Sequence, residues 1–353
     1  MKKMVNRLLC LLAVGAISVS FTGCSSSGSN GKVVVYNWGD YIDPEVNDQF
    51  TKETGIKVVY SEYANNEEMY ASVEPGNVSY DVLFPSDYMI EKMINNNMLQ
   101  KIDMSKIPNY EKIDAQFKGL PYDANDAYSI PYMWGTMGIV YNTTKVTEPV
   151  TSWDILWDSK YDDQIFMYDS ERDSIMVALK KLGYSMNTRS EAELEEAKEL
   201  LIEQAPLVLA YVGDEGKNKM INGEAALMLA WAGDAMVMLA ENPDLAYVVP
   251  EEQGSNWFVD GIVIPNNATN VDEAYEYINF LCRPDIAAKN AEYIGYSTPI
   301  SEAKELLPEE IKNSEVAYPD ASLLSDPKME MFNDPSNIIE LYSSIWTQVK
   351  ASN

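Results

Sequence analysis

The segment 32–60, KVVVYNWGDYIDPEVNDQFTKETGIKVVY, contains two apolar runs separated by a helix pattern. The β-branched run 32–37 predicts a strand, and the run 56–60 predicts a second one. The residues between them carry the marks of a short amphipathic helix: Asp43 as N-cap, Pro44 at the first helical position, Val46 and Phe50 on one face, and Gly55 as stop. Strand, helix and strand in this order are typical of a parallel sheet, so we expect an α/β fold.

The same alternation continues along the chain. The further predicted elements are helices over 67–73, 87–95, 174–182 and 190–203, and strands over 80–84, 164–168, 226–230 and 247–249. A chain of 353 residues is longer than a single hydrophobic core usually supports. We therefore expect two lobes, each a mixed or parallel sheet flanked by helices. Trp153 and Trp157, four apart on a predicted helix, are expected in the core, as is Trp346.

The N-terminus has the order of a secretion signal. Three basic residues precede an apolar run over 8–21, which is shorter than the roughly 20 residues that cross a membrane. The run ends at Thr22-Gly23-Cys24, which resembles the lipobox of bacterial lipoproteins, with Phe21 where that motif usually has leucine. We expect 1–23 to be a signal peptide, Cys24 to carry lipid and 24–31 to be a flexible tether. An ordinary signal peptide is the alternative, and either one predicts a location in the periplasm or on the extracellular face of the cytoplasmic membrane.

The composition excludes several kinds of site. The chain has no histidine, which excludes the usual serine and cysteine triads, histidine-ligated metals and histidine bases. Cys10 and Cys24 lie in the signal region, so only Cys282 remains in the body and a disulfide framework is excluded. The net charge of −29 should repel nucleic acid and attract cations, although solubility alone also explains it. We expect no cofactor and no metal.

A set of short motifs follows an order known from one protein family. The motifs are Asn37-Trp38-Gly39-Asp40-Tyr41, 50–58, Tyr80-Asp81 with Pro85-Ser86-Asp87-Tyr88, 130–135, Thr151-Ser152-Trp153, 179–184, 279–285 and 294–299. In them the chain resembles bacterial spermidine/putrescine-binding proteins, the lipoproteins that serve polyamine ABC importers. The resemblance implies the two-lobed periplasmic-binding-protein fold of class II. One lobe would comprise 31–138 plus 259–304, and the other 139–258 plus 305–353.

The resemblance also implies a polyamine ligand between the lobes, permease and ATPase subunits as partners, and a monomer. The ligand residues carried over are the acids Asp40, Asp173, Asp234 and Asp260, the aromatic walls Trp38, Tyr41, Trp231, Phe258 and Tyr296, and Ser86 as a polar contact. Asp87 is not carried over from the family as a ligand residue; it lies in the same turn as Ser86 and either contacts the ligand or caps the following helix. Carboxylates suit the ammonium groups of a polyamine, and aromatic faces suit its methylene groups.

Some departures from the family pattern bear on which polyamine is preferred. They are Gly39 in place of a hydroxyl residue, Ser170 in place of an acid of the spermidine branch, Phe332 in place of its glutamine, and Asp40 and Asp234, which resemble the putrescine branch. Together they favour putrescine slightly without excluding spermidine. The sequence leaves open whether Phe258 or the neighbouring Trp257 faces the ligand.

Three other functions compete with polyamine capture. An oligosaccharide receptor would also use tryptophan faces, but its site should hold more neutral amides than acids. A glycosidase needs a pair of carboxylates in acid and base roles, and no such pair is identifiable. A structural or adhesive lipoprotein would need no enclosed site. We expect a binding protein that closes its lobes around a cation, not an enzyme.

Overall fold

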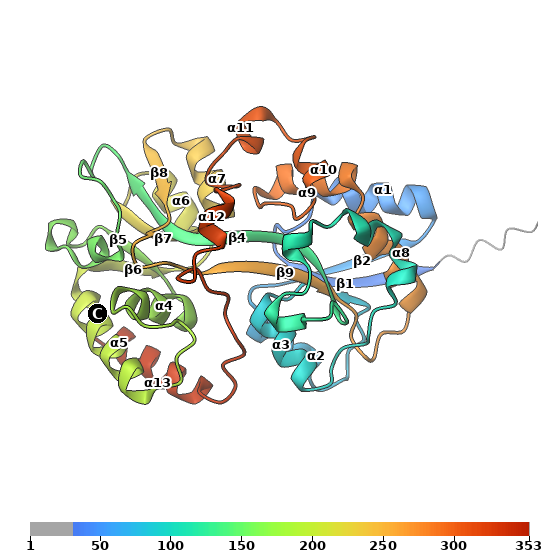
Figure 1. Cartoon of the computed structure of the whole chain (residues 1–353), viewed down its shortest axis with the longest axis horizontal. Coiled ribbons are helices and arrows are strands. Elements are labelled where there is room, and N and C mark those ends of the chain that lie inside the picture. Colours follow the sequence, from blue (N-terminus) through green and yellow to red (C-terminus); the bar gives the residue numbers. More distant parts are fainter. Residues whose placement is uncertain (1–30, 353) are drawn as a thin grey trace, which may run out of the picture.

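The computed structural model describes residues 31–352, so the expected signal peptide, Cys24 and nearly all of the expected tether lie outside the described residues. Two α/β lobes lie side by side, and the strands β4 and β9 run from one into the other (Figure 1). Neither lobe of this described part contains a helix long and apolar enough to cross a membrane.

The first lobe is built on β1 (Lys32–Trp38), which pairs in parallel with β2 (Lys57–Tyr63) and β3 (Val82–Leu83). The helices of this lobe are α1 (Pro44–Thr54), α2 (Asn66–Val73), α3 (Asp87–Asn95), α8 (Val271–Leu281), α9 (Pro284–Ile294) and α10 (Ser301–Lys304). The caps of α1 are those predicted: the Asp43 side chain accepts from the amide of Glu45, and Gly55 ends the helix at φ 77°. The β-α-β prediction is therefore confirmed.

Two long strands join the lobes. The strand β4 (Ser129–Asn142) pairs with β9 (Trp257–Val263) as far as Thr136, and from Met137 it pairs with β7 (Leu227–Trp231). The strand order is β2-β1-β3-β9-β4-β7-β5-β6, and β8 (Leu245–Val248) also pairs with β4. The sheets of both lobes thus share the continuous strand β4, which in the second lobe lies between β7 and β8.

The second lobe has β5 (Ile165–Tyr168) in parallel between β6 (Val208–Val212) and β7. Its helices are α4 (Glu171–Lys181), α5 (Glu191–Gln204), α6 (Glu215–Ile221), α7 (Ala232–Glu241) and α13 (Ile339–Lys350). The last of these, α13, packs on α4 and α5 around a separate apolar cluster that includes Trp346, which confirms the core prediction for that tryptophan.

Short helices fill the connections. They are the α-helical turns α11 (Glu309–Lys312) and α12 (Ala321–Leu324) and the 3-10 helices η1 (Met104–Lys106), η2 (Pro108–Lys112), η3 (Ala115–Phe117), η4 (Pro121–Asp123), η5 (Trp153–Trp157), η6 (Ser159–Tyr161) and η7 (Ala205–Leu207). The segment 153–157 is therefore a 3-10 helix and not the α-helix that the tryptophan spacing suggested. Its core position was predicted correctly for Trp153, which is fully buried, whereas Trp157 is only partly buried.

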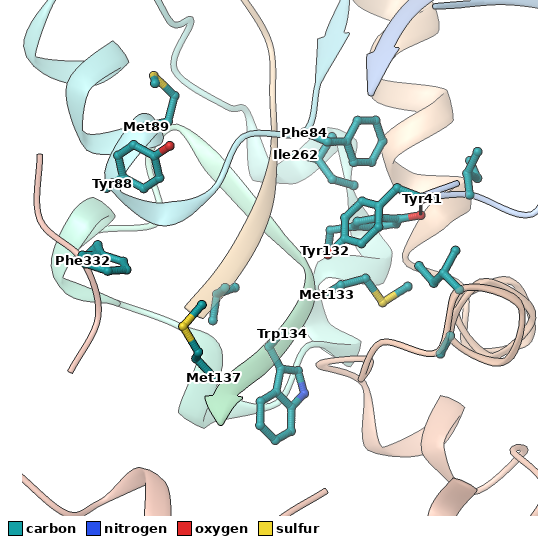
Figure 2. Packing of buried hydrophobic residues seen from close by; sticks show 14 of the residues in the cluster. Tyr41, Phe84, Tyr88, Met89, Tyr132, Met133, Trp134, Met137, Ile262 and Phe332 are labelled. Carbon is teal, nitrogen blue, oxygen red and sulfur yellow. Dashed lines mark hydrogen bonds between the residues drawn. The ribbon is translucent and has the colours of Figure 1, made fainter. Parts of the chain in front are cut away.

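The core follows the shared strand. Met133, Trp134 and Met137 are buried along β4, and Figure 2 shows Met133 next to Tyr132 and Tyr41. The indole of Trp134 packs against Phe117 and donates to the carbonyl of Thr298 at 3.2 Å. The crossing between the lobes is therefore lined by tightly packed side chains.

Candidate functional site

The site begins where β1 and β3 end. Ligands of α/β sheets bind outside the carboxyl ends of the strands, and both Trp38 and Ser86 lie there. The indole of Trp38 donates to the carbonyl of Phe84 at 2.8 Å, which fixes the ring at the end of β1. Ser86 forms a β-bridge to Asp260 on β9. Three of the predicted ligand residues are thereby positioned at one edge of the sheet.

Asp260 is buried at this edge, with 5% of its surface exposed. Its Oδ2 accepts a hydrogen bond from the Tyr41 hydroxyl at 2.5 Å, while its Oδ1 is buried without a hydrogen-bond partner in residues 31–352. Burial raises the pKa of Asp260 to about 6, although the hydrogen bond from Tyr41 and the nearby Ser86 hydroxyl act in the opposite direction. One oxygen of this carboxylate can therefore still accept from a cationic donor.

Asp87 is a second buried carboxylate, next to the first. The N-cap of α3 is Ser86 and not Asp87, which is the first helical residue. Asp87 Oδ1 accepts from the amide of Tyr88 at 2.7 Å, and Oδ2 is buried without a partner among the described side chains. Burial, together with the charge of Asp260, raises the pKa of Asp87 well above its ordinary value. Asp87 is therefore not the N-cap that the sequence offered as an alternative, and its bond to the Tyr88 amide engages only one of its two oxygens.

Aromatic rings surround these acids. Tyr41 meets Tyr132 edge to face at a centroid distance of 5.6 Å, and it meets Tyr296 in the same way at 5.4 Å (Figure 2 shows the first pair). Phe258 lies 6.2 Å from Tyr296. Because side chains alternate along a strand, Phe258 shares one face of β9 with Asp260, and Trp257 points to the other face. This alternation supports Phe258 as the ring beside the acids.

The second-lobe side contributes Asp234, near the start of α7. Its Oδ2 accepts from the Tyr168 hydroxyl at 3.1 Å, and its Oδ1 accepts from Lys217 Nζ at 3.2 Å. The ring of Tyr168 stacks on Trp231 at 4.2 Å, so the acid and the tryptophan are held together. Burial raises the pKa of Asp234 above its ordinary value, against the effect of the Lys217 charge.

Tyr296 connects the two ends of the site. The charges of both Asp234 and Asp260 raise its pKa, after the larger effect of burial. Gly233, next to Asp234, lies so close to Tyr296 that a Cβ atom there would overlap the ring. Residues from both lobes therefore meet around this tyrosine.

An arginine that the sequence analysis missed also links the lobes. The guanidinium of Arg172 on α4 lies 3.8 Å from the ring centre of Tyr88 on α3 and 5.1 Å from that of Phe332. One of its nitrogens is 3.4 Å from Glu67 on α2. Figure 2 shows Phe332 and Tyr88 near each other. In the sequence, the only sign of Arg172 is its position next to Asp173, because a lone arginine forms no recognisable pattern.

Two of the predicted acids lie less centrally. Asp173 is buried, but its Oδ2 accepts from the Ser170 hydroxyl at 2.7 Å, which caps α4. Asp40 is exposed in the turn after β1, at φ 52°, and its side chain has no hydrogen bond in the described part of the chain.

The structure thus brings together Asp260, Asp87, Tyr41, Ser86, Phe258 and Tyr296 on one side and Asp234 with Trp231 on the other. Lys217 and Tyr168 at the second end were not predicted, because each depends on a contact between separate elements.

Comparisons with known proteins agree with this architecture. Residues 45–319 match the model of a family described as bacterial extracellular solute-binding protein. The chain is 40% identical over 343 residues to a spermidine/putrescine-binding periplasmic protein of Salmonella typhimurium, covering 97% of each. It is 30% identical to the putrescine-binding periplasmic protein PotF of Escherichia coli, covering 90% of each.

Solved structures show the same fold. The spermidine/putrescine ABC transporter substrate-binding protein PotD of Streptococcus pneumoniae is 42% identical, with a TM-score of 0.81 over 91% of this chain and 99% of that one. The Tp0655 (TpPotD) lipoprotein of Treponema pallidum is 28% identical, with a TM-score of 0.82 over 90% of this chain and 99% of that one. These matches confirm the fold class and the resemblance found in the sequence. The chain therefore belongs to the family of bacterial extracellular solute-binding proteins.

Proposed function

We propose that this protein captures a polyamine, spermidine or putrescine, outside the cytoplasmic membrane and delivers it to an ABC importer. The observation that carries the proposal is the pair of buried carboxylates, Asp260 and Asp87, each with one oxygen that lacks a partner in residues 31–352. A buried charge is costly unless a counter-charge and hydrogen bonds satisfy it. An ammonium group supplies both.

The rest of the ligand would be an alkyl chain with a second charge. Phe258 and Tyr296 offer ring faces and edges for methylene groups, and Trp38 stands at the edge of the same site. Asp234 and the exposed Asp40 would face the ammonium at the far end. An ammonium bound to a carboxylate contributes about 1.5 to 3 kcal/mol and one over an aromatic ring about 0.5 to 2 kcal/mol. Two acids and three rings thus suffice for micromolar binding.

The competing functions fit less well. An oligosaccharide has no cation for Asp260 and Asp87, and its hydroxyl groups would leave the buried charge of Asp260 without a counter-charge. The family and the named relatives are binding proteins and not enzymes, so the glycosidase alternative is dropped.

The lobe boundaries belong to the same proposal. We place them at 138/139 and 258/259, with 305–353 in the second lobe, and the change of β4 from pairing with β9 to pairing with β7 near Met137 supports this division. Arg172 and Phe332 of the second lobe both contact Tyr88 of the first, so ligand release would require these contacts to open.

Calorimetry tests the function directly. The protein is purified, unfolded and refolded to strip any bound ligand, and titrated with putrescine, spermidine and maltose. We expect micromolar or tighter binding of at least one amine and no heat with maltose. Binding of maltose but of neither amine would favour the sugar-receptor function instead. The absence of heat with both amines would overturn the proposal.

The affinity should depend on pH. Because the pKa of Asp260 is about 6, its carboxylate is ionised at pH 7.5 and becomes protonated as the pH falls through 6. Protonation removes the counter-charge of the ammonium, so binding of putrescine should be about 10-fold weaker at pH 5.0 than at pH 7.5. Burial raises the pKa of Asp87, Asp173 and Asp234 too, and their protonation acts in the same direction. Equal dissociation constants at the two pH values would contradict an ionised carboxylate as the amine acceptor.

We also propose that Cys24 carries a lipid that anchors the protein, working as a monomer, to the extracellular face of the cytoplasmic membrane. Support comes from the motif before the cysteine and from the relative of Treponema pallidum that is itself named a lipoprotein. Cys24→Ser should therefore release the protein from the membrane fraction into the soluble fraction, as followed by immunoblotting. Continued membrane association of that variant would count against lipidation.

A further inference from the structure

Lys217 is a cation that already lies in the candidate site. It projects from α6, and its Nζ lies 3.2 Å from Oδ1 of Asp234 on α7. The pair is largely shielded, with 27% of the lysine side chain and 9% of the aspartate side chain exposed. Burial alone would lower the pKa of Lys217, but the charges of Asp234 and Asp214 raise it, so the ammonium stays protonated.

The two ends of the site therefore differ. At the first-lobe end, Asp260 and Asp87 each have an oxygen without a partner in the described residues. At the second-lobe end, both oxygens of Asp234 are engaged, one by Tyr168 and one by Lys217. A ligand ammonium at the first end meets free acceptors. At the second end it meets a carboxylate that is already paired with a protein cation.

Acidic residues surround Lys217, so its charge determines how many ligand ammonium groups the second-lobe end can accept. Asp214 lies one turn before Lys217, and the charge of Asp40 also acts on the lysine. Without the lysine, Asp234, Asp214 and Asp40 would form a region of uncompensated negative charge, which suits an additional ammonium group. With the lysine, one positive charge is supplied by the protein itself.

We propose that Lys217 takes the place beside Asp234 that a third ligand ammonium would otherwise occupy, and so limits the preferred ligand to two ammonium groups, a short diamine rather than a triamine. The inference rests on the proposed function and adds its substrate class. A third ammonium would have to displace Lys217 from Asp234 or lie close to it, and like charges at contact distance repel. The selectivity of this receptor is therefore set in part by a residue that competes with the ligand.

The test compares two lysines of one helix. Lys217→Met removes the ammonium and keeps an unbranched chain, whereas Lys219→Met removes the same charge from a lysine whose Nζ lies 5.9 Å from the ring centre of Phe166. Dissociation constants of the full chain are measured by calorimetry for putrescine, a dication, and spermidine, a trication. Lys217→Met should shift the preference towards spermidine about 10-fold. This is the effect expected when the third ammonium gains one charge-assisted hydrogen bond to Asp234 at a partly exposed position. Lys219→Met should leave the preference unchanged.

Further arms separate the possible failures. Lys217→Arg keeps a cation on Asp234 and should retain the preference of the wild type, and it also serves if Lys217→Met does not fold. An unchanged ratio of the two dissociation constants in Lys217→Met, with the wild type binding amines, would overturn the inference and leave the proposed function standing. An equal shift in Lys219→Met would assign the effect to net charge and also overturn it. A wild type that binds neither amine would overturn both proposals.

Discussion

Asp260→Asn is expected to weaken putrescine binding by about 10- to 150-fold, which corresponds to about 1.5 to 3 kcal/mol. The substitution keeps the size of the side chain and removes its charge. Asp260 Oδ2 is already bound by the Tyr41 hydroxyl, so the buried Oδ1 is the oxygen available to an ammonium. An amide in its place offers at most a neutral acceptor to a desolvated cation. Calorimetric titration of the variant and the wild type at pH 7.5 measures the difference.

The same variant should not lose stability. The pKa of Asp260 lies above its unfolded value, so the stability that this group contributes is present at low pH and is lost as the pH rises through about 6. Above that pH the ionised carboxylate destabilises the ligand-free protein, and asparagine removes this effect. The melting temperature of ligand-free Asp260→Asn at pH 7.5 should therefore equal or exceed that of the wild type. A large fall would mean that the loss of binding reflects unfolding.

A matched control removes one negative charge elsewhere. Asp272 pairs with Lys106 on the surface, where 87% of its side chain is exposed. Asp272→Asn changes the net charge by the same amount but should leave putrescine binding unchanged, because an exposed charge is screened by salt. Unchanged affinity in Asp260→Asn would remove this residue from the site. Equal losses in both variants would assign the effect to the overall field of the protein.

Local sequence signals predicted the elements that depend on local contacts. The helix α1 has the N-cap and the glycine stop that its sequence indicated. The predicted strand 80–84 is shorter, at Val82–Leu83. The amide of Asp81 still donates to the carbonyl of Val34 on β1, and its side chain accepts from the backbone amides of Val34, Thr269 and Asn270. These bonds join distant segments, so no local pattern fixes where this strand begins. The 3-10 helix at Trp153 is likewise fixed from a distance, by Gln253 and Gly254.

Except for Asp87, the individual ligand residues were predicted from the family resemblance, but the contacts between them were not. The bond between Tyr41 and Asp260 joins residues 219 positions apart, and no local pattern encodes it. Lys217 and Asp234 face each other from two helices, and Arg172 reaches from one lobe into the other. These contacts depend on how the lobes are packed. The sequence could therefore name the acids of the site, while the structure shows which of them already have a partner.

Gly233→Ala is expected to weaken putrescine binding by roughly 5- to 150-fold, because it obstructs the approach of the lobes. A Cβ atom at this position would overlap the ring of Tyr296, which meets Tyr41 and Phe258 on the first-lobe side. Relieving the overlap requires the ring or the lobe to move, and overpacking of this kind costs about 1 to 3 kcal/mol. The cost falls on the closed form. Alanine itself favours the helix α7 by up to about 1 kcal/mol, so the ligand-free protein should remain folded.

Gly39 provides the control for this substitution, since it lies between Trp38 and Asp40 and a Cβ atom there would meet nothing within 4 Å. Gly39→Ala should therefore leave the affinity within about 2-fold of the wild type, as for substitutions that make no new contact. Small-angle scattering adds a second measurement that reports closure and not contact. Saturating putrescine should compact the wild type and Gly39→Ala, whereas Gly233→Ala should compact less at the same ligand occupancy. Full compaction and unchanged affinity in Gly233→Ala would show that the Tyr296 ring can move aside with no cost in free energy. The close approach of Gly233 to Tyr296 would then have no part in closure.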